Sequence, residues 1–413
     1  MNRDVMLLRV KYMNINKLLN ALIVLYAFSL PLSKALTTLL ELLIVVLWIA
    51  RPVRKNDLEI IFRSPLIVWL IVFVLFGLVA VSWSSDKLFA LDYLAKYHHF
   101  LLVPVIITIL DKDYVDNAIF GFLAGNVISV FASLGVFWGV LSIEGVPSTD
   151  PSPFMDHANH SVYLAFSAII AMHLSFIDKT RKALFLILMT LFVVNLFLLA
   201  GRTGQVIFVV SLILYLFMVV KNKLQAMVLS GIIVSLVLCF SYYFSPIFKK
   251  RVNAFVAEYQ NVFEKGDYSG SFSRRVSLWV MGWNVFLDNP ILGTGIGDER
   301  TGMNKYAKKY NFKEYISEQD FGYIDYHNAF IQYSVQLGVV GMITFIGMLL
   351  ALWSLRIENP KYAPLSKIFV LMFVMFSMVG LTMHIMSSMV LFALFSGLFL
   401  RLEILEANKT KTT

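Results

Sequence analysis

Long apolar blocks constrain the fold of this chain more than any other feature of its sequence. A helix crosses a bilayer with ~20 consecutive apolar residues, and blocks of about that length recur from one end of the chain to the other. Hydrophobic residues make up 59% of the chain and charged residues only 15%, which is less charge than a soluble domain of this length carries. We therefore expect an all-α polytopic membrane protein rather than a two-domain soluble chain.

The apolar blocks divide into about twelve predicted transmembrane helices. The fourth block is short enough to be partly re-entrant. No cleavable signal peptide is expected, because the first block leads straight into the second without a small-residue cleavage site. The predicted spans lie near 18–32, 33–50, 65–81, 98–110, 117–141, 160–177, 183–200, 204–220, 225–244, 327–355, 367–383 and 386–402.

The distribution of positive charge predicts the orientation of the chain. Lysine and arginine gather in both tails and in alternate connections, whereas the connection over 142–159 on the other side has neither. The positive-inside rule therefore predicts that both termini are cytoplasmic. The net charge of +9 then reflects topology, and nucleic acid is not an expected partner. The single cysteine, Cys239, excludes a disulfide framework and a cysteine-based zinc site.

One long connection, over 245–325, interrupts a single membrane domain that takes up residues 1–413. It falls on the outer side between the ninth and tenth predicted spans and is too long for a simple connector. Helical spacing of apolar residues predicts a first loop helix over 246–263, lying on the outer membrane surface. A second helix is expected to start at Ser271 or Ser273 and to stop at Pro290, followed by the sequence GTGIG as a flexible turn.

Arg202 is the clearest candidate for function, because ionisable groups at membrane depth are expensive. It lies between two apolar blocks at the predicted outer boundary, flanked by Gly201 and Gly204. One interpretation is an arginine that reaches to the interface with its charged end. The other is an anion anchor, with a planar fork of donors suited to phosphate and small glycines that let a ligand approach the backbone.

A pair of cations, Arg274 and Arg275, lies at the start of the second loop helix. Trp279 and Trp283 follow Arg275 at spacings of four and eight, so they share one helical face with it. This pattern is typical of an interfacial helix with an aromatic belt. It equally suits a phosphate site, because free N–H groups at a helix N-terminus add to the positive charge.

His327 stands with Asn328 where an apolar segment begins. A lone histidine at the end of a span is commonly a satisfied interfacial residue. Its usual pKa also makes it a natural proton shuttle near neutral pH, and the neighbouring Asp325 and Asn328 are candidates to orient its ring. We therefore expect His327 to be the catalytic base.

A further polar group precedes the sixth predicted span. Asp156, His157 and His160 resemble metal ligands superficially, but no cysteine or histidine set completes them, so no metal and no other cofactor is expected. We interpret them as a rim that hydrogen-bonds sugar hydroxyls. Lys96 and His98, at the start of the fourth block, are expected to serve the same outer cavity.

Together these residues offer two or three cations and one candidate base on the outer face. That set suits a lipid-linked diphosphate substrate, with arginines holding the diphosphate and a histidine handling a hydroxyl proton. A transporter would place charged residues deep within several spans. Here the spans are nearly free of charge except for Glu41, which favours an enzyme.

Three sequence stretches resemble the successive signatures of the O-antigen ligase and polymerase superfamily, the Wzy-C group. They are AGRTG, RRVSLWVMGWNVFLDNPILGTGIG and HNAFIQYSVQLGVVG, and the resemblance covers roughly 195–345. The matching positions are Arg202, Arg275, Trp279, Pro290, Gly293, Gly295, His327, Asn328, Gly338 and Gly341.

This resemblance implies a GT-C-type glycosyltransferase with about twelve transmembrane helices and a large helical periplasmic loop. Such an enzyme takes a glycan from undecaprenyl diphosphate at the periplasmic face of a Gram-negative inner membrane, without a metal and with inversion. By the family pattern, Arg202 and Arg275 bind the diphosphate, and His327 is the general base or positions the donor. The other polar candidates, Arg274, Trp279 and Asn328 among them, support the substrate.

Within the superfamily, a ligase transfers polysaccharide to the lipid A core, and we take this as the first choice. The short C-terminal tail and the single loop favour it. A polymerase that extends a lipid-linked chain and an oligosaccharyltransferase that glycosylates protein are the alternatives.

Overall fold

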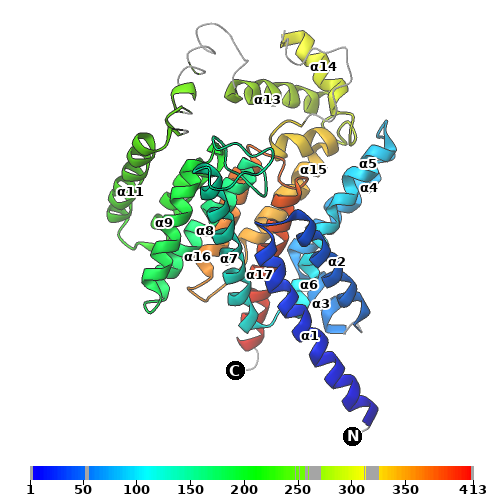
Figure 1. Ribbon diagram of the computed structural model, residues 1–413. Coiled ribbons are helices and arrows are strands. Elements are labelled where there is room, and N and C mark those ends of the chain that lie inside the picture. The colour runs from blue at the N-terminus through cyan, green and yellow to red at the C-terminus, as the bar shows by residue number, and fades with distance from the viewer. Residues whose placement is uncertain are drawn as a thin grey trace.

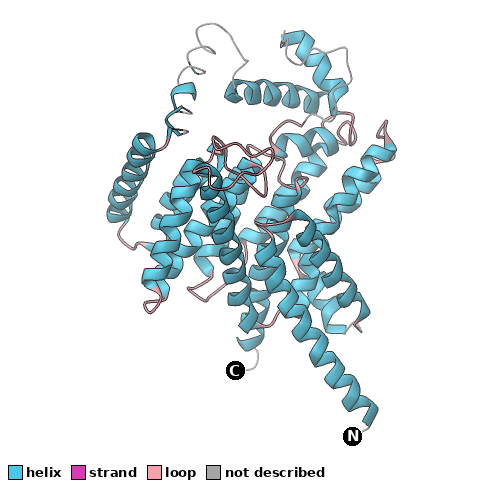
Figure 2. Ribbon diagram, viewed as in Figure 1, coloured by secondary structure: helices cyan, strands magenta, loops and turns pink. Residues whose placement is uncertain are grey.

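The regular structure of the chain is helical throughout the part that the structure describes. The computed structural model describes residues 3–51, 55–246, 248–250, 252–255, 259, 271–310, 312 and 325–410. Over these residues the named elements are all helices, and the β-type contact is an isolated bridge between Ile143 and Val146 (Figure 2). The expectation of an all-α protein is confirmed.

Each predicted apolar block contains at least one of the observed helices. In chain order they are α1 (Arg3–Ser29), α2 (Lys34–Ala50), α3 (Lys55–Arg63), α4 (Pro65–Ala80), α5 (Lys87–Ala95), the 3₁₀ helix η1 (Lys96–Leu101), α6 (Leu102–Ile109), α7 (Lys112–Phe137), α8 (His157–Ile177), α9 (Lys182–Leu198), α10 (Arg202–Val219), α11 (Lys223–Phe244), α13 (Ser271–Asp288), α14 (Glu299–Tyr310), α15 (Ala329–Trp353), α16 (Ala363–Ser377) and α17 (Met386–Thr410).

Several of these helices are built to cross a membrane. Among the described residues, six are long and apolar enough to span a bilayer alone: α7, α8, α10, α11, α15 and α17. The pair α3 and α4, bent by 75°, gives up to one more, and shorter apolar helices lie in α1, α9 and α16. The chain is therefore a polytopic membrane protein, while the expected count of about twelve spans stays a prediction.

Two predicted blocks differ from the helices that occupy them. The fourth becomes η1 followed by the eight-residue α6, so it is short as expected, and its re-entrant path stays a prediction. The prediction for 367–383 ends too late, since α16 stops at Ser377. The error has a physical reason: Leu381 and Met383 are fully buried in the core although their backbone is a loop, so hydrophobicity continues where the helix does not.

The helices pack into one bundle, with α1 along α7, α8 against both α9 and α10, and α4 along α15. Phenylalanine rings from four helices meet in its centre, where Phe395 contacts Phe122, Phe166 and Phe369 at 4.7–5.5 Å between ring centroids. Edge-to-face and tilted aromatic contacts of this kind add to packing beyond the area that they bury.

The outer connection builds a cap across one end of the bundle. Helices α13 and α14 lie over the end where α15 begins, and both termini lie at the opposite end (Figure 1). As expected, α13 begins at Ser271 and ends at Asp288, just before Pro290. Of the predicted surface helix over 246–263, residues 246, 248–250, 252–255 and 259 are described and helical, and the other positions lie outside the described residues.

Helix α15 is broken at Gly338, where φ is +63° and ψ is −157°. The segment after α13 fills the break with backbone hydrogen bonds: Val339 N–H donates to the Pro290 carbonyl at 2.8 Å, and Gly295 N–H donates to the Gln336 carbonyl at 3.1 Å. Irregular backbone at membrane depth is tolerated only where protein satisfies it. The GTGIG sequence is therefore a fixed strap rather than the flexible turn that we expected.

Candidate functional site

His327 is held by Asp325 through a single carboxylate oxygen. Oδ1 of Asp325 lies 2.6 Å from the backbone nitrogen of His327 and 3.0 Å from its ring Nδ1. An ionised carboxylate only accepts hydrogen bonds, so Nδ1 carries the proton and Nε2 keeps a lone pair. The His327 side chain is 52% exposed and that of Asp325 21%, which leaves the imidazole accessible to a substrate.

The backbone at His327 adopts a left-handed conformation with φ +46°. Such values are uncommon outside glycine, and strained positions of this kind cluster at functional sites. The next residue, Asn328, fixes the turn, because its side-chain oxygen accepts hydrogen bonds from Phe330 N–H at 3.0 Å and Ile331 N–H at 3.2 Å. Asn328 is thus the N-cap of α15, while Asp325 orients His327.

Asp325 is ionised near neutral pH. Burial on its own would raise the pKa of this carboxyl, but the hydrogen bond to His327 and the charge of that ring lower it, with a smaller contribution from His384. A carboxylate in this position stabilises the imidazolium that forms when His327 accepts a proton.

Two arginines from separate elements, Arg275 and Arg202, interact electrostatically with each other, and Arg275 also interacts with Asp325. Burial lowers the pKa of the Arg275 guanidinium, the charge of Arg202 lowers it further, and Asp325 acts in the opposite direction. Arg275, near the start of α13, therefore lies within electrostatic range of Arg202 at the start of α10 and of Asp325 in the loop before α15. Two guanidinium groups that repel each other across a site are poised to bind a doubly charged anion such as a diphosphate.

Direct packing between helices sets the position of Arg202 at the start of α10. Gly204 N–H donates to Ser161 Oγ of α8 at 3.0 Å. A Cβ at Gly201 would overlap the His157 carbonyl, and one at Gly204 would overlap the backbone of Ser161. The expectation that these glycines leave room for a ligand is therefore wrong, since α8 fills that space.

The other residues of the second loop helix have separate surroundings. Arg274 is exposed. Trp279 packs against the hydrophobic cluster between α13 and α14, and Trp283, which is 52% exposed, lies 5.3 Å from Phe286 between ring centroids. Arg275 thus shares its face with one largely packed indole and one exposed indole.

Lys96 contacts His384, which interacts electrostatically with Asp325. His384 was not among the residues predicted for the site. Lys96 Nζ lies 3.0 Å from His384 Nε2, and the His384 ring stacks on Tyr93 at 3.8 Å between ring centroids. Burial, and then the charge of Lys96, lower the pKa of His384 to about 4, while Asp325 raises it. His384 is therefore a neutral acceptor for the Lys96 ammonium. Its signal in the sequence was a histidine between two apolar blocks, as for His327.

The remaining polar candidates lie in different environments. Asp156 caps α8 by accepting a hydrogen bond from Asn159 N–H at 3.0 Å, and His157 Nδ1 lies 2.9 Å from Asp150. His160 is fully buried, with Nε2 3.0 Å from Ser129 Oγ of α7. The two imidazoles of His157 and His160 thus do not present one common face.

Beneath the His327 turn lies a buried carboxyl group, Glu299 of α14. It accepts hydrogen bonds from the side-chain amides of Gln336 and, at 3.0 Å, Gln332. Gln332 in turn accepts the backbone N–H of Tyr326 at 3.1 Å. Burial raises the pKa of Glu299 to about 7. This network ties the cap to α15 and to the residue before His327, and no pattern in the sequence pointed to Glu299.

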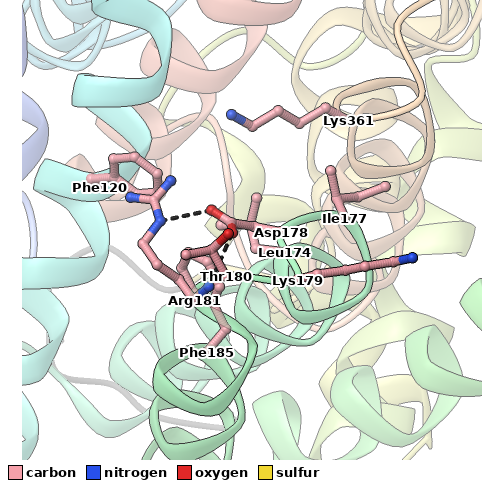
Figure 3. A pocket seen from close by; sticks show the side chains of 9 residues that line it. All are labelled: Phe120, Leu174, Ile177, Asp178, Lys179, Thr180, Arg181, Phe185 and Lys361. Carbon is pink, nitrogen blue, oxygen red and sulfur yellow. Dashed lines mark hydrogen bonds and ion pairs between the residues drawn. The ribbon is translucent and has the colours of Figure 1, made fainter.

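A cavity of about 420 Å³ lies away from this site (Figure 3). It surrounds the connection between α8 and α9, at the end of the bundle that carries the termini (Figure 1). None of the predicted site residues lines it. Its lining residues are Phe120, Leu174, Ile177, Asp178, Lys179, Thr180, Arg181, Phe185 and Lys361.

Comparison with known proteins covers the part of the chain that builds the site. Residues 184–346 match the family model described as O-antigen ligase. This segment, 163 of the 413 residues, is similar to the O-antigen ligase family. None of the curated proteins matches the chain.

The O-antigen ligase segment contains Arg202, Arg275 and His327 together with the broken part of α15. The resemblance drawn from the three sequence stretches is thereby confirmed at the level of the superfamily. The family supports a glycosyl-transfer enzyme of the ligase or polymerase type, with lipid-linked glycan as its class of substrate.

Proposed function

We propose that the chain is an O-antigen ligase that transfers polysaccharide from undecaprenyl diphosphate to a sugar hydroxyl of the lipid A core. One observation carries the proposal: Asp325, which holds His327, interacts electrostatically with Arg275, and Arg275 interacts with Arg202. A proton acceptor and a double cation in one site are what the transfer requires.

His327 is the general base in this proposal. Its Nε2 accepts the proton of the acceptor hydroxyl as the oxygen attacks the anomeric carbon. Asp325 keeps the proton on Nδ1 and stabilises the imidazolium that results. Because the carboxylate does not need to move, the ring is oriented before substrate binds.

The two arginines act on the leaving group. As the bond between the anomeric carbon and the phosphate oxygen breaks, negative charge develops on undecaprenyl diphosphate, and Arg202 and Arg275 stabilise it. The new bond forms on the opposite face of the sugar, so the anomeric centre inverts. Two guanidinium charges supply the electrostatic stabilisation, and we infer a metal-independent reaction on a GT-C-type scaffold.

The orientation of the chain supports a periplasmic site. Both termini lie at the end opposite α13 and α14 (Figure 1), and the positive-inside rule assigns the termini to the cytoplasm. The capped end with His327 then faces the periplasm from the inner membrane. Lipid-linked glycan and the lipid A core meet at that face.

A reconstituted transfer assay tests this function. The purified protein is mixed with undecaprenyl diphosphate-linked glycan and rough lipopolysaccharide, with and without EDTA. His327→Ala, Arg202→Ala and Arg275→Ala run beside the wild type, and Lys308→Ala is the control for loss of an exposed charge of the cap that is not among the candidate site residues.

We expect a ladder on lipopolysaccharide that survives EDTA, persists in Lys308→Ala and disappears in the three site variants. Growth of the lipid-linked glycan while lipopolysaccharide stays unmodified would instead show a polymerase. Transfer that continues in His327→Ala at the wild-type rate would remove the base from the mechanism.

A further inference from the structure

Three ionisable side chains within the bundle take no part in the proposed transfer. Glu41 lies on α2, and His98 and His99 lie on η1. One ligand atom from each of the three lies within 4.8 Å of the others. His98 was expected to serve the outer cavity, but the His98 ring faces Glu41.

Burial of these ionisable side chains costs free energy unless they have compensating partners. Glu41 is 2% exposed and His99 4%, and a carboxylate buried among apolar helices needs compensating partners. Its Oε2 lies 2.7 Å from His99 Nδ1 and accepts a long hydrogen bond of 3.5 Å from Tyr26. Its Oε1 has no hydrogen-bond partner among the residues that the structure describes.

The orientation of His98 leaves the Oε1 atom of Glu41 without a hydrogen-bond donor from that ring. Its Nδ1 lies 2.8 Å from the Ala95 carbonyl, so this nitrogen donates its proton and Nε2 bears the lone pair. That Nε2 lies 3.8 Å from Glu41 Oε1, too far for a hydrogen bond. Two acceptors thus face each other, and a cation between them would satisfy both.

The same contact is typical of histidines that bind metals. Such histidines usually donate their other ring N–H to a backbone carbonyl or carboxylate, which fixes the ligating nitrogen. The rings of His98 and His99 lie 4.1 Å apart between centroids, so both flank the carboxylate of Glu41.

We propose that Glu41, His98 and His99 bind a divalent transition-metal ion, zinc foremost. Two imidazole nitrogens and one carboxylate oxygen are the donors that zinc accepts, with a fourth position left for water. Calcium and magnesium are disfavoured because they take oxygen ligands, six or more for calcium, whereas this cluster supplies a single carboxylate.

The ion has a structural role and lies outside the transfer chemistry. It joins α2 to η1, a 3₁₀ segment whose first residue, Lys96, contacts His384 of the candidate site. A 3₁₀ helix has poorer hydrogen-bond geometry than an α-helix, so a metal cross-link here compensates for weak local structure.

Metal binding to the purified full-length chain tests the proposal independently of activity. The protein is prepared without a polyhistidine tag, stripped with a chelator and dialysed against Zn²⁺ or Co²⁺. Bound metal is measured by mass spectrometry, and Co²⁺ coordination by its visible absorption. The variants are Glu41→Gln and His98→Ala, with His157→Ala as the control, because His157 also pairs with a carboxylate.

We expect about one equivalent of metal in the wild type and in His157→Ala, and affinity reduced about tenfold or more in the other two variants. Thermal melting shows whether each variant folds, and the half-exposed His98 provides the test if Glu41→Gln does not. Equal binding in all four proteins, or no Co²⁺ absorption in the wild type, overturns the proposal and leaves a protonated histidine as the partner of Glu41.

Discussion

One carboxylate oxygen of Asp325 lies 2.6 Å from the backbone nitrogen of His327 and 3.0 Å from its Nδ1. This double contact links the backbone conformation at His327 to the tautomer of its imidazole ring. The backbone contact supports the left-handed turn, and the ring contact sets which nitrogen is free. An isolated histidine at a helix end has neither constraint.

Asp325→Asn should lower the rate of transfer more than it lowers substrate binding. The amide keeps the size of the side chain, but its NH₂ group can favour the other imidazole tautomer, which leaves Nε2 protonated. We expect kcat to fall by about 10²-fold, within the range that general-base catalysis supplies, with little change in KM for the donor. Steady-state kinetics in proteoliposomes measure both constants. A variant with the kcat of the wild type would show that Asp325 only shapes the turn.

Arg275→Lys should not preserve activity although it preserves charge. A guanidinium binds a phosphate with two parallel donors, whereas an ammonium is a point charge. Loss of one charged hydrogen bond costs about 1.5–3 kcal/mol, so kcat/KM for the donor should fall by about tenfold or more. Arg63→Lys, at an exposed arginine of α3 that is not among the candidate site residues, is the control and should keep the wild-type value. Similar kinetics for the two variants would argue against a bidentate contact from Arg275.

Glu299→Gln should change how stability depends on pH. Burial raises the folded-state pKa of Glu299 to about 7 from its ordinary value of 4.5. The folded state therefore holds a proton that the unfolded state releases, and stability falls as pH rises from about 4.5 to about 7, by ~3 kcal/mol at most. Glutamine can still accept from both amides and does not titrate.

Thermal melting from pH 4.5 to pH 8 measures this effect. The wild type should lose stability across the lower part of that range, and Glu299→Gln should be flatter. Asp325 acts in the opposite sense, since its lowered pKa means that its contribution is lost only as pH falls through the acid range. Parallel curves for the two proteins would show that Glu299 is already ionised in the fold.

Gly293→Ala should destabilise the protein strongly. Gly293 has φ +74°, and a Cβ there would lie 2.5 Å from the carbonyl group of Gln336, so both backbone strain and overlap oppose the substitution. We expect a loss of about 1–3 kcal/mol or more, seen as a lower melting temperature. Gly231→Ala in α11 is the matched control, because a Cβ there meets nothing within 4 Å and alanine favours a helix by about 1 kcal/mol. Equal melting temperatures for the two variants would contradict a tight strap.

The sequence by itself determined where most of the long apolar helices lie, although it did not predict α3, α5 or α14. Each apolar block became a helix because hydrophobicity, helix propensity and capping act over neighbouring residues: Ser33 caps α2, Asn328 caps α15, and α13 ends ahead of Pro290. It also supplied Arg202, Arg275 and His327, through stretches that resemble one superfamily. These are local properties, and a single chain displays them directly.

The tertiary structure alone decided how distant residues meet. The break at Gly338 is satisfied by Pro290 and Gly295, and Glu299 finds its partners on α15. Hydrophobic periodicity does not reveal such pairs, because each of the two segments follows its own local pattern. The stabilising free energy comes from the contact between the segments. The same reason explains why Gly201 and Gly204 suggested an open site in the sequence but serve helix packing in the fold: a missing side chain makes room, and only the three-dimensional structure shows what fills it.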